Sequence, residues 1–440
     1  MIRKVFSGFL TIWAGSISIY SQNLQGPMLT LHDAICLALK NEPLLVRAEA
    51  EIKIQRARLE RSRSGFFPYV NIGGIAKKGL SGAGGAFRLS GLAGSPQPDD
   101  LAVSGNIYYD LIDFGRRRHA SQAHQHHLEA LHEKVKGEKA SIVLSVQRSY
   151  YRVLRIQKGS LSFTQTLVEE KELKVRKAEI LLQAQIGSKF DLSVAQSELT
   201  KARLELTQAT HQENHVLARL QRVVSQPAPK GGYLLQSPSI SPVPPLSKEE
   251  LQQNAREQRP EIRSSKAQIR AYESWLEKAR SEKKPGLMAA FSSGFARFSE
   301  ITLGKLLFGG LGLKLPIFNG GDLKAQIQEA VHTLNAAHSD KDVLLQEIYL
   351  QVETAWIQIQ KTLNAIKTHE ELYRHAVDQF RLVEILKATE LSDAVELSVR
   401  ATNVARTKME LAQQLYDYAA ARAELDYAAG LTIGEFVDNK

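Results

Sequence analysis

The sequence predicts a mostly helical protein with a membrane β-barrel part, built from a duplicated unit of long antiparallel helices that carries four strands in all. Three observations support this fold class: an internal repeat with an offset of 217 residues, two long proline-free stretches of helix-forming residues, and strands that alternate between apolar and small or polar residues. The chain has 440 residues, of which 43% are hydrophobic, so a sizeable core is expected.

Composition excludes several classes of protein. The formal net charge is +10, but the basic residues are scattered among acidic ones, so nucleic acid is not an expected partner. The single cysteine, Cys36, excludes an intrachain disulfide and a Cys-based zinc site. Because no nucleophile elbow, phosphate-binding loop or HExxH motif occurs, we predict a protein that is not an enzyme and needs no cofactor.

Residues 1–21 predict a secretory signal peptide. Arg3 and Lys4 supply the charged start, an apolar run follows over 5–15, and small residues such as Ser21 precede the expected cleavage site. A buried N-terminal helix is the alternative. Beyond this segment no stretch of 18 apolar residues occurs.

The internal repeat is clearest between residues 30–68 and 247–285. Nine aligned positions are identical, among them Pro43 with Pro260 and Arg63 with Arg280. We therefore expect a first structural repeat over 22–225, a proline-rich linker over 226–246, a second repeat over 247–430 and a C-terminal tail over 431–440.

Each repeat is expected to hold a pair of strands, at about 66–80 and 101–111 in the first and at about 286–298 and 301–317 in the second. From 101 to 111, apolar residues and glycine occupy one face and small or polar residues the other, over a length that fits a tilted membrane strand. A soluble hairpin is the alternative. Since four strands cannot close a membrane barrel, the chain is expected to share one with further copies of itself.

The helices of each repeat differ in length in a regular way. The first repeat is expected to have helices over 31–63 and 189–224, of about 33 and 36 residues, and one long helix of about 70 residues over 116–186. Because the two short lengths sum to the long one, two short helices can stack beside one long antiparallel helix. This arrangement is typical of a long cylinder of helices.

Several segments carry a likeness to a known family. They are the opening helix over 29–43, the helix-to-strand transition over 63–72, the strand-to-helix turns YDLIDFGRRR (109–118) and LPIFNGGDLKAQIQEA (315–330), and the hairpin-tip helices over 186–206 and 389–414. Together these segments resemble the TolC-like outer-membrane efflux protein family. The residues of the turns that carry the likeness are Phe114, Gly115, Phe318, Gly320 and Gly321. The resemblance covers nearly the whole mature chain.

The resemblance implies a homotrimer with a 12-stranded barrel in outer-membrane lipid and a helical tunnel in the periplasm. It implies a passive exit duct of a tripartite efflux pump, joined to an inner-membrane transporter through a periplasmic adaptor (membrane fusion) protein. The exit duct of a type I protein-secretion system is an alternative of the same class. An alternative of another class is a soluble periplasmic coiled-coil scaffold or adaptor.

By the same resemblance, the two hairpin tips dock the adaptor and acidic residues line the closed periplasmic mouth. The tip residues are Gly187, Ser188, Lys189, Thr389, Glu390, Leu391 and Ser392. The residues of the pore constriction are Asp393, Glu396 and Asp191. The sequence departs from the family at Lys387, where many members have glycine, and at Glu384 and Thr389, where some members have a gate tyrosine and arginine.

One histidine cluster admits two interpretations. His119, His124, His126, His127 and His132 lie close together in the sequence, and pairs of them share helix faces. They either touch a metal ion on a tunnel wall or belong to a solvated stretch of helix. The sequence favours the second interpretation, and no metal site is predicted.

Overall fold

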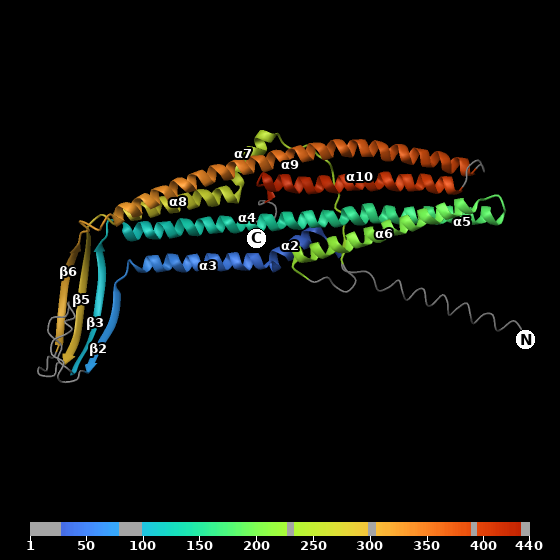
Figure 1. Ribbon diagram of the computed structural model, residues 1–440. Coiled ribbons are helices and arrows are strands. Elements are labelled where there is room, and N and C mark those ends of the chain that lie inside the picture. Colours follow the sequence, from blue (N-terminus) through green and yellow to red (C-terminus); the bar gives the residue numbers. More distant parts are fainter. Residues whose placement is uncertain (1–27, 79–98, 227–232, 298–304, 389–393, 433–440) are drawn as a thin grey trace, which may run out of the picture. The chain divides into compact units, whose positions relative to one another are not determined.

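The computed structural model describes residues 28–78, 99–226, 233–297, 305–388 and 394–432 (Figure 1). The predicted signal peptide and the tip residues Thr389–Asp393 lie outside these ranges, as does most of the stretch between the strands predicted at about 66–80 and 101–111. The chain divides into two compact units. The first unit is formed by the described residues of 1–48, 135–260 and 345–440, and the second unit by those of 49–134 and 261–344.

The elements recur in the same order in the two halves of the chain. The first half contains β1 (Met28–Leu29), α2 (Leu31–Asn41), α3 (Pro43–Ser64), β2 (Tyr69–Lys78), β3 (Asp99–Ile112), α4 (Arg116–Arg155), a π-helical segment η1 (Ile156–Leu161), α5 (Ser162–Gln183) and α6 (Lys189–Val224). The second contains β4 (Leu234–Leu235), α7 (Lys248–Gln258), α8 (Pro260–Ser281), β5 (Gly286–Arg297), β6 (Lys305–Lys314), α9 (Asp322–Ala388) and α10 (Ala394–Ala428). The predicted fold class, long helices with four long strands per chain, is confirmed.

In the described part of the chain, no helix combines the length and the apolar character needed to cross a membrane.

The single helix predicted over 31–63 is two helices, α2 and α3, which meet at Glu42 in an extended conformation with ψ of 117°. Pro43 is the cause, because proline has no N–H to donate and disfavours helical geometry in the residue before it. As the first residue of α3 it sits where a missing N–H costs nothing. Pro260 produces the same break between α7 and α8, where Arg259 has ψ of 127°.

The long segment predicted over 116–186 is also interrupted. Between α4 and α5, the six residues of η1 follow π-helical geometry, and the buried Gly159 lies within it. A side chain at this position would come within 3.4 Å of Gln413 and 3.6 Å of Met409, so glycine lets α10 approach closely. The corresponding helix of the second half, α9, runs through 67 residues without such a segment.

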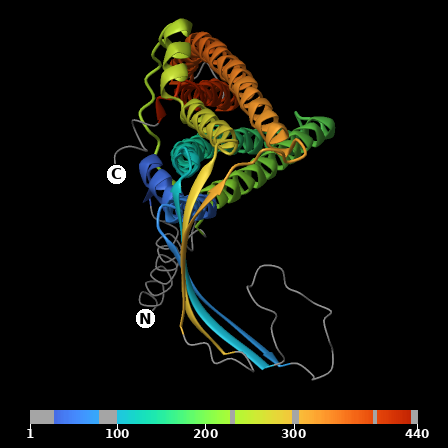
Figure 2. The same ribbon diagram turned by 90° about the vertical axis from the view of Figure 1, so that its left-hand side faces the viewer.

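Four long strands form one antiparallel sheet in the order β2-β3-β5-β6. Figure 2 shows them side by side and curving together. The strict alternation expected up to Leu111 is wrong at its end, because the pairing with β5 shifts between Asp110 and Ile112 and leaves Leu111 as a β-bulge. A bulge places two residues opposite one, which ends the regular alternation just before the turn into α4.

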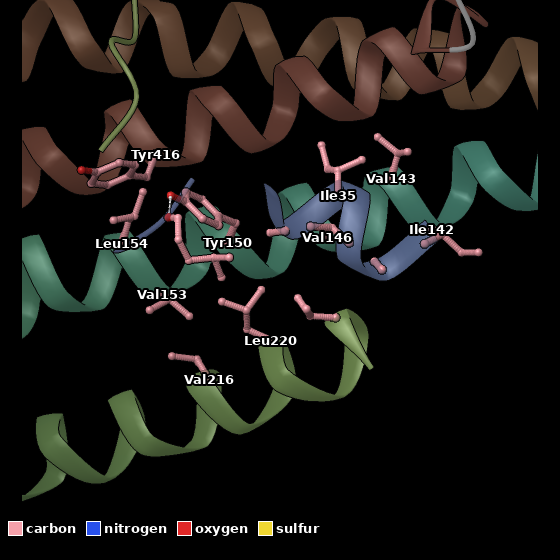
Figure 3. Packing of buried hydrophobic residues seen from close by; sticks show 14 of the residues in the cluster. Ile35, Ile142, Val143, Val146, Tyr150, Val153, Leu154, Val216, Leu220 and Tyr416 are labelled. Carbon is pink, nitrogen blue, oxygen red and sulfur yellow. Dashed lines mark hydrogen bonds between the residues drawn. The ribbon is translucent and has the colours of Figure 1, made fainter. Parts of the chain in front are cut away.

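A hydrophobic core holds the first unit together. It joins Ala34, Ile35 and Ala38 of α2 to Val143, Val146, Val153 and Leu154 of α4 and to Val216, Leu220 and Val224 of α6 (Figure 3). On α2 and α4 these residues recur three to four positions apart, which is the spacing that places apolar side chains on one helix face.

The described part of the proline-rich segment between the halves, residues 233–246, makes contacts at several points. Its strand β4 pairs in parallel with β1, and the fully buried Tyr150 donates its hydroxyl to the carbonyls of Leu29 at 2.8 Å and Gln236 at 2.7 Å. Further along, the Tyr418 hydroxyl accepts from the Val243 amide at 2.9 Å and donates to the Val243 carbonyl at 3.0 Å. Because Tyr150 belongs to α4 and Tyr418 to α10, the segment ties helices of both halves together.

Replacing Tyr150 by phenylalanine removes a donor to two carbonyls, of which that of Leu29 keeps the Gln236 amide at 3.2 Å as a second donor. We expect Tyr150→Phe to lower the free energy of unfolding by about 1–3 kcal/mol, the usual cost of unsatisfied buried polar groups. Burial raises the pKa of Tyr150 to about 12, so this contribution is present below pH of about 10 and is lost as the pH rises through about 12. Thermal unfolding followed by circular dichroism measures it. The control is Tyr349→Phe, a half-buried tyrosine of α9, and equal melting temperatures for the two variants would contradict the expectation.

Candidate functional site

The sheet presents two chemically different faces. On one face, Val70, Ile107 and Phe291 lie in register across three strands, and Ile72 and Leu307 nearby are 82% and 73% exposed. A sheet face that exposes this much contiguous apolar surface is suited to contact with lipid rather than water.

The opposite face carries a row of polar side chains. Asn71, Asn106 and Ser292 are aligned across β2, β3 and β5. The Ser292 hydroxyl donates to Asn106 Oδ1 at 2.7 Å, and Asn106 Nδ2 donates to Ser104 Oγ at 3.3 Å. Phe308 of β6, which pairs with Ser292, is the exception in this row. A polar face of this kind is suited to water.

The two outer strands of the sheet each have one neighbour. In the part of the chain that the structure describes, β2 pairs only with β3 and β6 pairs only with β5. Each therefore presents a row of backbone N–H and C=O groups along its outer edge. Such an edge is a template for pairing with another strand.

The first strand-to-helix turn is built around Asp113. Its Oδ1 accepts from the Gly115 amide at 3.2 Å, and its Oδ2 accepts from the amide and the Nε of Arg117 at 2.9 and 2.8 Å. Burial raises the pKa of Asp113, but these hydrogen bonds and the charge of Arg117 outweigh it, so the pKa lies below its ordinary value. The carboxylate thus satisfies amides that open α4, as capping side chains do.

Arg117 links this turn to the helix-to-strand transition before β2. Besides its ion pair with Asp113, its Nη1 donates to the Gly65 carbonyl at 2.9 Å. Its guanidinium lies over the rings of Phe66 at 5.4 Å and Tyr109 at 5.7 Å. Sequence reasoning missed the role of this arginine, because Gly65 and Phe66 lie about 50 residues before it in the chain.

The turns place the glycines that the sequence singled out in backbone conformations that favour glycine. Gly115 has φ of 92°, and the preceding Phe114 has φ of 49°, which is uncommon for a bulky side chain. In the second turn, Gly320 and Gly321 have φ of 64° and 89°, and Phe318 is 89% exposed.

The first hairpin tip joins α5 to α6 through a tight turn. Gly187 approaches the backbone of Leu181 and Leu182 so closely that a Cβ would lie 2.9 Å from each, so only glycine fits. The Ser188 hydroxyl caps α6 by accepting from the Phe190 amide at 3.0 Å, and Lys189 is exposed as its first residue.

Exposed apolar side chains gather at both tips. Ile186 and Phe190 flank the first tip and are 78% and 73% exposed, and Leu382 and Ile385 near the end of α9 are both 63% exposed. Sequence reasoning missed these residues and named the polar ones between them. The available signal was the occurrence of Ile186 and Phe190 in a turn, where polar residues are usual.

The structure brings only part of the predicted pore constriction into view. Asp191 lies exposed in the first turn of α6, and Glu396 lies exposed in the first turn of α10. Asp393 and the tip residues Thr389, Glu390, Leu391 and Ser392 lie outside the described residues. Acidic residues in a first helical turn also complement the helix dipole, which gives these positions a structural role as well.

The histidine cluster is engaged in contacts within the second unit. His124 Nδ1 accepts from Gln55 Nε2 at 3.2 Å, and the ring stands edge-on to Trp275, with ring centroids 5.1 Å apart. His127 bonds Gln268 at 2.8 Å. Burial, then the nearby His127 and Arg58, lower the pKa of His124. Among the described residues, no group of three or more histidine, cysteine or acidic side chains is arranged to hold a metal ion.

Two stretches of the chain, residues 34–225 and 251–431, match the family described as outer membrane efflux protein. Together they cover most of the sequence. The chain belongs to the outer membrane efflux protein family. Membership places it in the outer membrane and among channel-type transport proteins.

Individual relatives are distant. The chain is 24% identical over 259 residues to the alkaline protease secretion protein AprF of Pseudomonas aeruginosa, a match that covers 56% of this chain and 52% of that protein. It is 21% identical to the outer membrane efflux protein BepC of Brucella suis, over 91% of this chain and 85% of the relative. The chain therefore spans about half of the length of AprF and most of the length of BepC.

Solved channels share the fold. The CmeC outer membrane channel of Campylobacter jejuni superimposes with a TM-score of 0.77 and 17% identity, over 91% of this chain and 86% of that chain. The order of strands and long helices described above is thus a known architecture.

The glycines of the second turn offer a sharp test of backbone strain. Neither Gly321 nor Gly73 of β2 has an atom within 4 Å of a substituted Cβ, but only Gly321 has a positive φ. We expect Gly321→Ala to lower the free energy of unfolding by about 1–2 kcal/mol, since a left-handed conformation is strained for alanine. Gly73→Ala is the matched control and should change it by less than about 0.5 kcal/mol. Similar melting temperatures for the two variants would show that the turn relaxes.

Proposed function

We propose that this protein is the passive exit duct of a tripartite efflux pump, formed by three copies of the chain in the outer membrane. The observation that carries the proposal is the four-stranded sheet with one apolar face, one polar face and two open edges. An apolar face fits lipid, and a polar face fits a water-filled passage.

The two open edges of the sheet are the reason to propose several copies of the chain in one barrel. In the hydrocarbon of a bilayer an unpaired backbone group costs several kcal/mol, so an open sheet is not viable there. Pairing β6 of one copy with β2 of the next removes both edges in a closed ring. Three copies give 12 strands, which lies within the range of membrane barrels.

A passive duct depends on partners for energy and direction. The sequence holds no phosphate-binding loop, so the energy for transport comes from an inner-membrane transporter that a periplasmic adaptor joins to this protein. A type I protein-secretion system is the second candidate, and the likeness to AprF, a protein named for protease secretion, favours it. The transporter encoded beside this chain distinguishes the two.

The hairpin tips suit the adaptor. Their polar turn residues, including Ser188 and Lys189, lie between exposed apolar residues, Ile186 and Phe190 at the first tip. An apolar patch with a polar rim is typical of a protein-binding surface. The buried Glu170 stiffens the hairpin behind this tip, because it pairs with Lys174 at 3.0 Å and Lys171 at 3.2 Å, and Lys171 reaches Glu198 of α6 at 3.0 Å.

Crosslinking tests the docking at the tips. We expect cysteine at Ser188, in a Cys36→Ser background, to form a crosslink with the tip of the adaptor, and cysteine at Thr207 in the middle of α6 to form none. The reason is that Ser188 lies between the two apolar residues of the tip, whereas Thr207 lies far along the helix from it. Equal crosslinking at both positions would remove the support for docking at the tip.

Channel recording tests the duct itself. We expect the protein in mild detergent to be a trimer by light scattering and to open discrete conductance steps in planar bilayers. A folded monomer without conductance would overturn the proposal.

The same recordings test the pore constriction. In a trimer, Asp393 and Glu396 would form two stacked carboxylate rings, with Asp191 nearby, and such rings favour cations. We therefore expect the variant with both Asp393→Ala and Glu396→Ala to lose cation selectivity and block by trivalent cations. The control is Glu205→Ala, an exposed carboxylate in the middle of α6. Unchanged selectivity in the double variant would leave these residues as solubilising charges.

A further inference from the structure

A second polar site lies in the first unit, away from the tips and the sheet. It is a hollow of about 430 Å³ between the end of α4, η1, α6 and α10. Pockets that bind small molecules have volumes of roughly 300–1,000 Å³, so the hollow is large enough for a small ligand. Its floor is apolar, with Ile156 and the buried Val216.

Basic side chains line its rim. Arg152 and Arg155 come from α4, and His211 and His215 come from successive turns of α6. No carboxylate lines the hollow among the described residues. Only Arg155 has an anionic partner, Asp417, at 3.3 Å, and the structure gives Arg152, His211 and His215 no hydrogen bond or ion pair with any described residue.

A neighbouring hollow differs, because the arginine in it has a carboxylate partner. The larger one between α4, α9 and α10, of about 940 Å³, also contains an arginine, Arg148. There the arginine donates to Glu424 at 2.8 Å, and Asp417 lines the same hollow. The first hollow lacks such a compensating group for Arg152.

Neutral donors complete the site. Gln212 and Gln413 line the hollow, and Gln413 Nε2 donates to the Ser160 hydroxyl at 3.3 Å. That contact uses the oxygen of Ser160 as acceptor and leaves its hydroxyl proton available. Ser160 lies in η1, the π-helical segment that α9 lacks, and π-helical turns are frequent at binding sites.

We propose that this hollow binds a soluble polyvalent oxyanion, such as pyrophosphate or a small molecule with several phosphate or carboxylate groups. An arginine with no carboxylate partner has its planar guanidinium available for two parallel hydrogen bonds to an oxyanion. The imidazoles, the amides and the hydroxyl add directed donors. The site goes beyond the exit duct, since it gives the helical part of the chain a ligand of its own.

Calorimetric titration with sodium pyrophosphate tests the site. The full-length protein in detergent, in its natural oligomeric state, is titrated at constant ionic strength with chloride as the competing ion. We expect saturable binding of one pyrophosphate per chain. Arg152→Gln should weaken it on the order of tenfold or more, the scale of one charge-assisted hydrogen bond, and the double variant His211→Gln with His215→Gln should weaken it several-fold.

The matched control is Arg219→Gln, an exposed arginine of α6 that does not line the hollow. Its affinity should equal that of the unaltered protein, and circular dichroism should show the same fold for every variant. Three results would each overturn the site: absence of saturable binding, an equal loss in the Arg219→Gln variant, or unchanged affinity in the Arg152→Gln variant.

Discussion

Every backbone N–H and C=O group needs a hydrogen-bond partner, and this requirement shapes the whole protein. The sheet pairs both edges of its inner strands and leaves one edge of β2 and one edge of β6 without a neighbour in the described part of the chain. In water such edges bind solvent, but in lipid they must bind protein. The apolar face of the same sheet requires lipid, so both demands apply together. The closure by further copies that we propose meets both demands, and the proposed channel follows from it.

The segment between the two halves has a mechanical role. The Tyr150 hydroxyl of α4 donates to the Gln236 carbonyl, and the Tyr416 hydroxyl of α10 lies 3.2 Å from Ser237 Oγ. Trp356 of α9 donates to the Leu246 carbonyl at 3.3 Å. Proline-rich chain has few N–H groups to pair, so side-chain donors supply much of its bonding. Within the first unit, this one segment therefore makes hydrogen bonds with helices of both halves of the chain. Any relative movement of these helices must stretch or break these contacts.

Charge is distributed unevenly along the same helices. Near the tip, Glu170 is enclosed by Lys171 and Lys174, and although burial raises the pKa of its carboxyl, the lysines hold it below the ordinary value. Farther along, Arg152 faces a hollow without a carboxylate. The first arrangement stiffens the hairpin behind the tip at which we propose adaptor docking. The second leaves Arg152 available at the site that we propose for an oxyanion.

Local patterns in the sequence were sufficient to predict the strands, one turn and the order of the elements. Alternation predicts the strands, Gly320 and Gly321 mark a turn, and the repeat predicts the order of elements. The sequence predicts one continuous helix over 31–63, and the structure breaks it at Pro43. The bulge at Leu111, the π-helical segment and the contacts of Tyr150 and Arg117 are visible only in the folded chain. The physical reason is distance along the chain. Periodicity depends on residues that are neighbours in the sequence. The bulge, the π-helical segment and these contacts involve residues about 50 to 250 positions apart, which meet only when the chain folds.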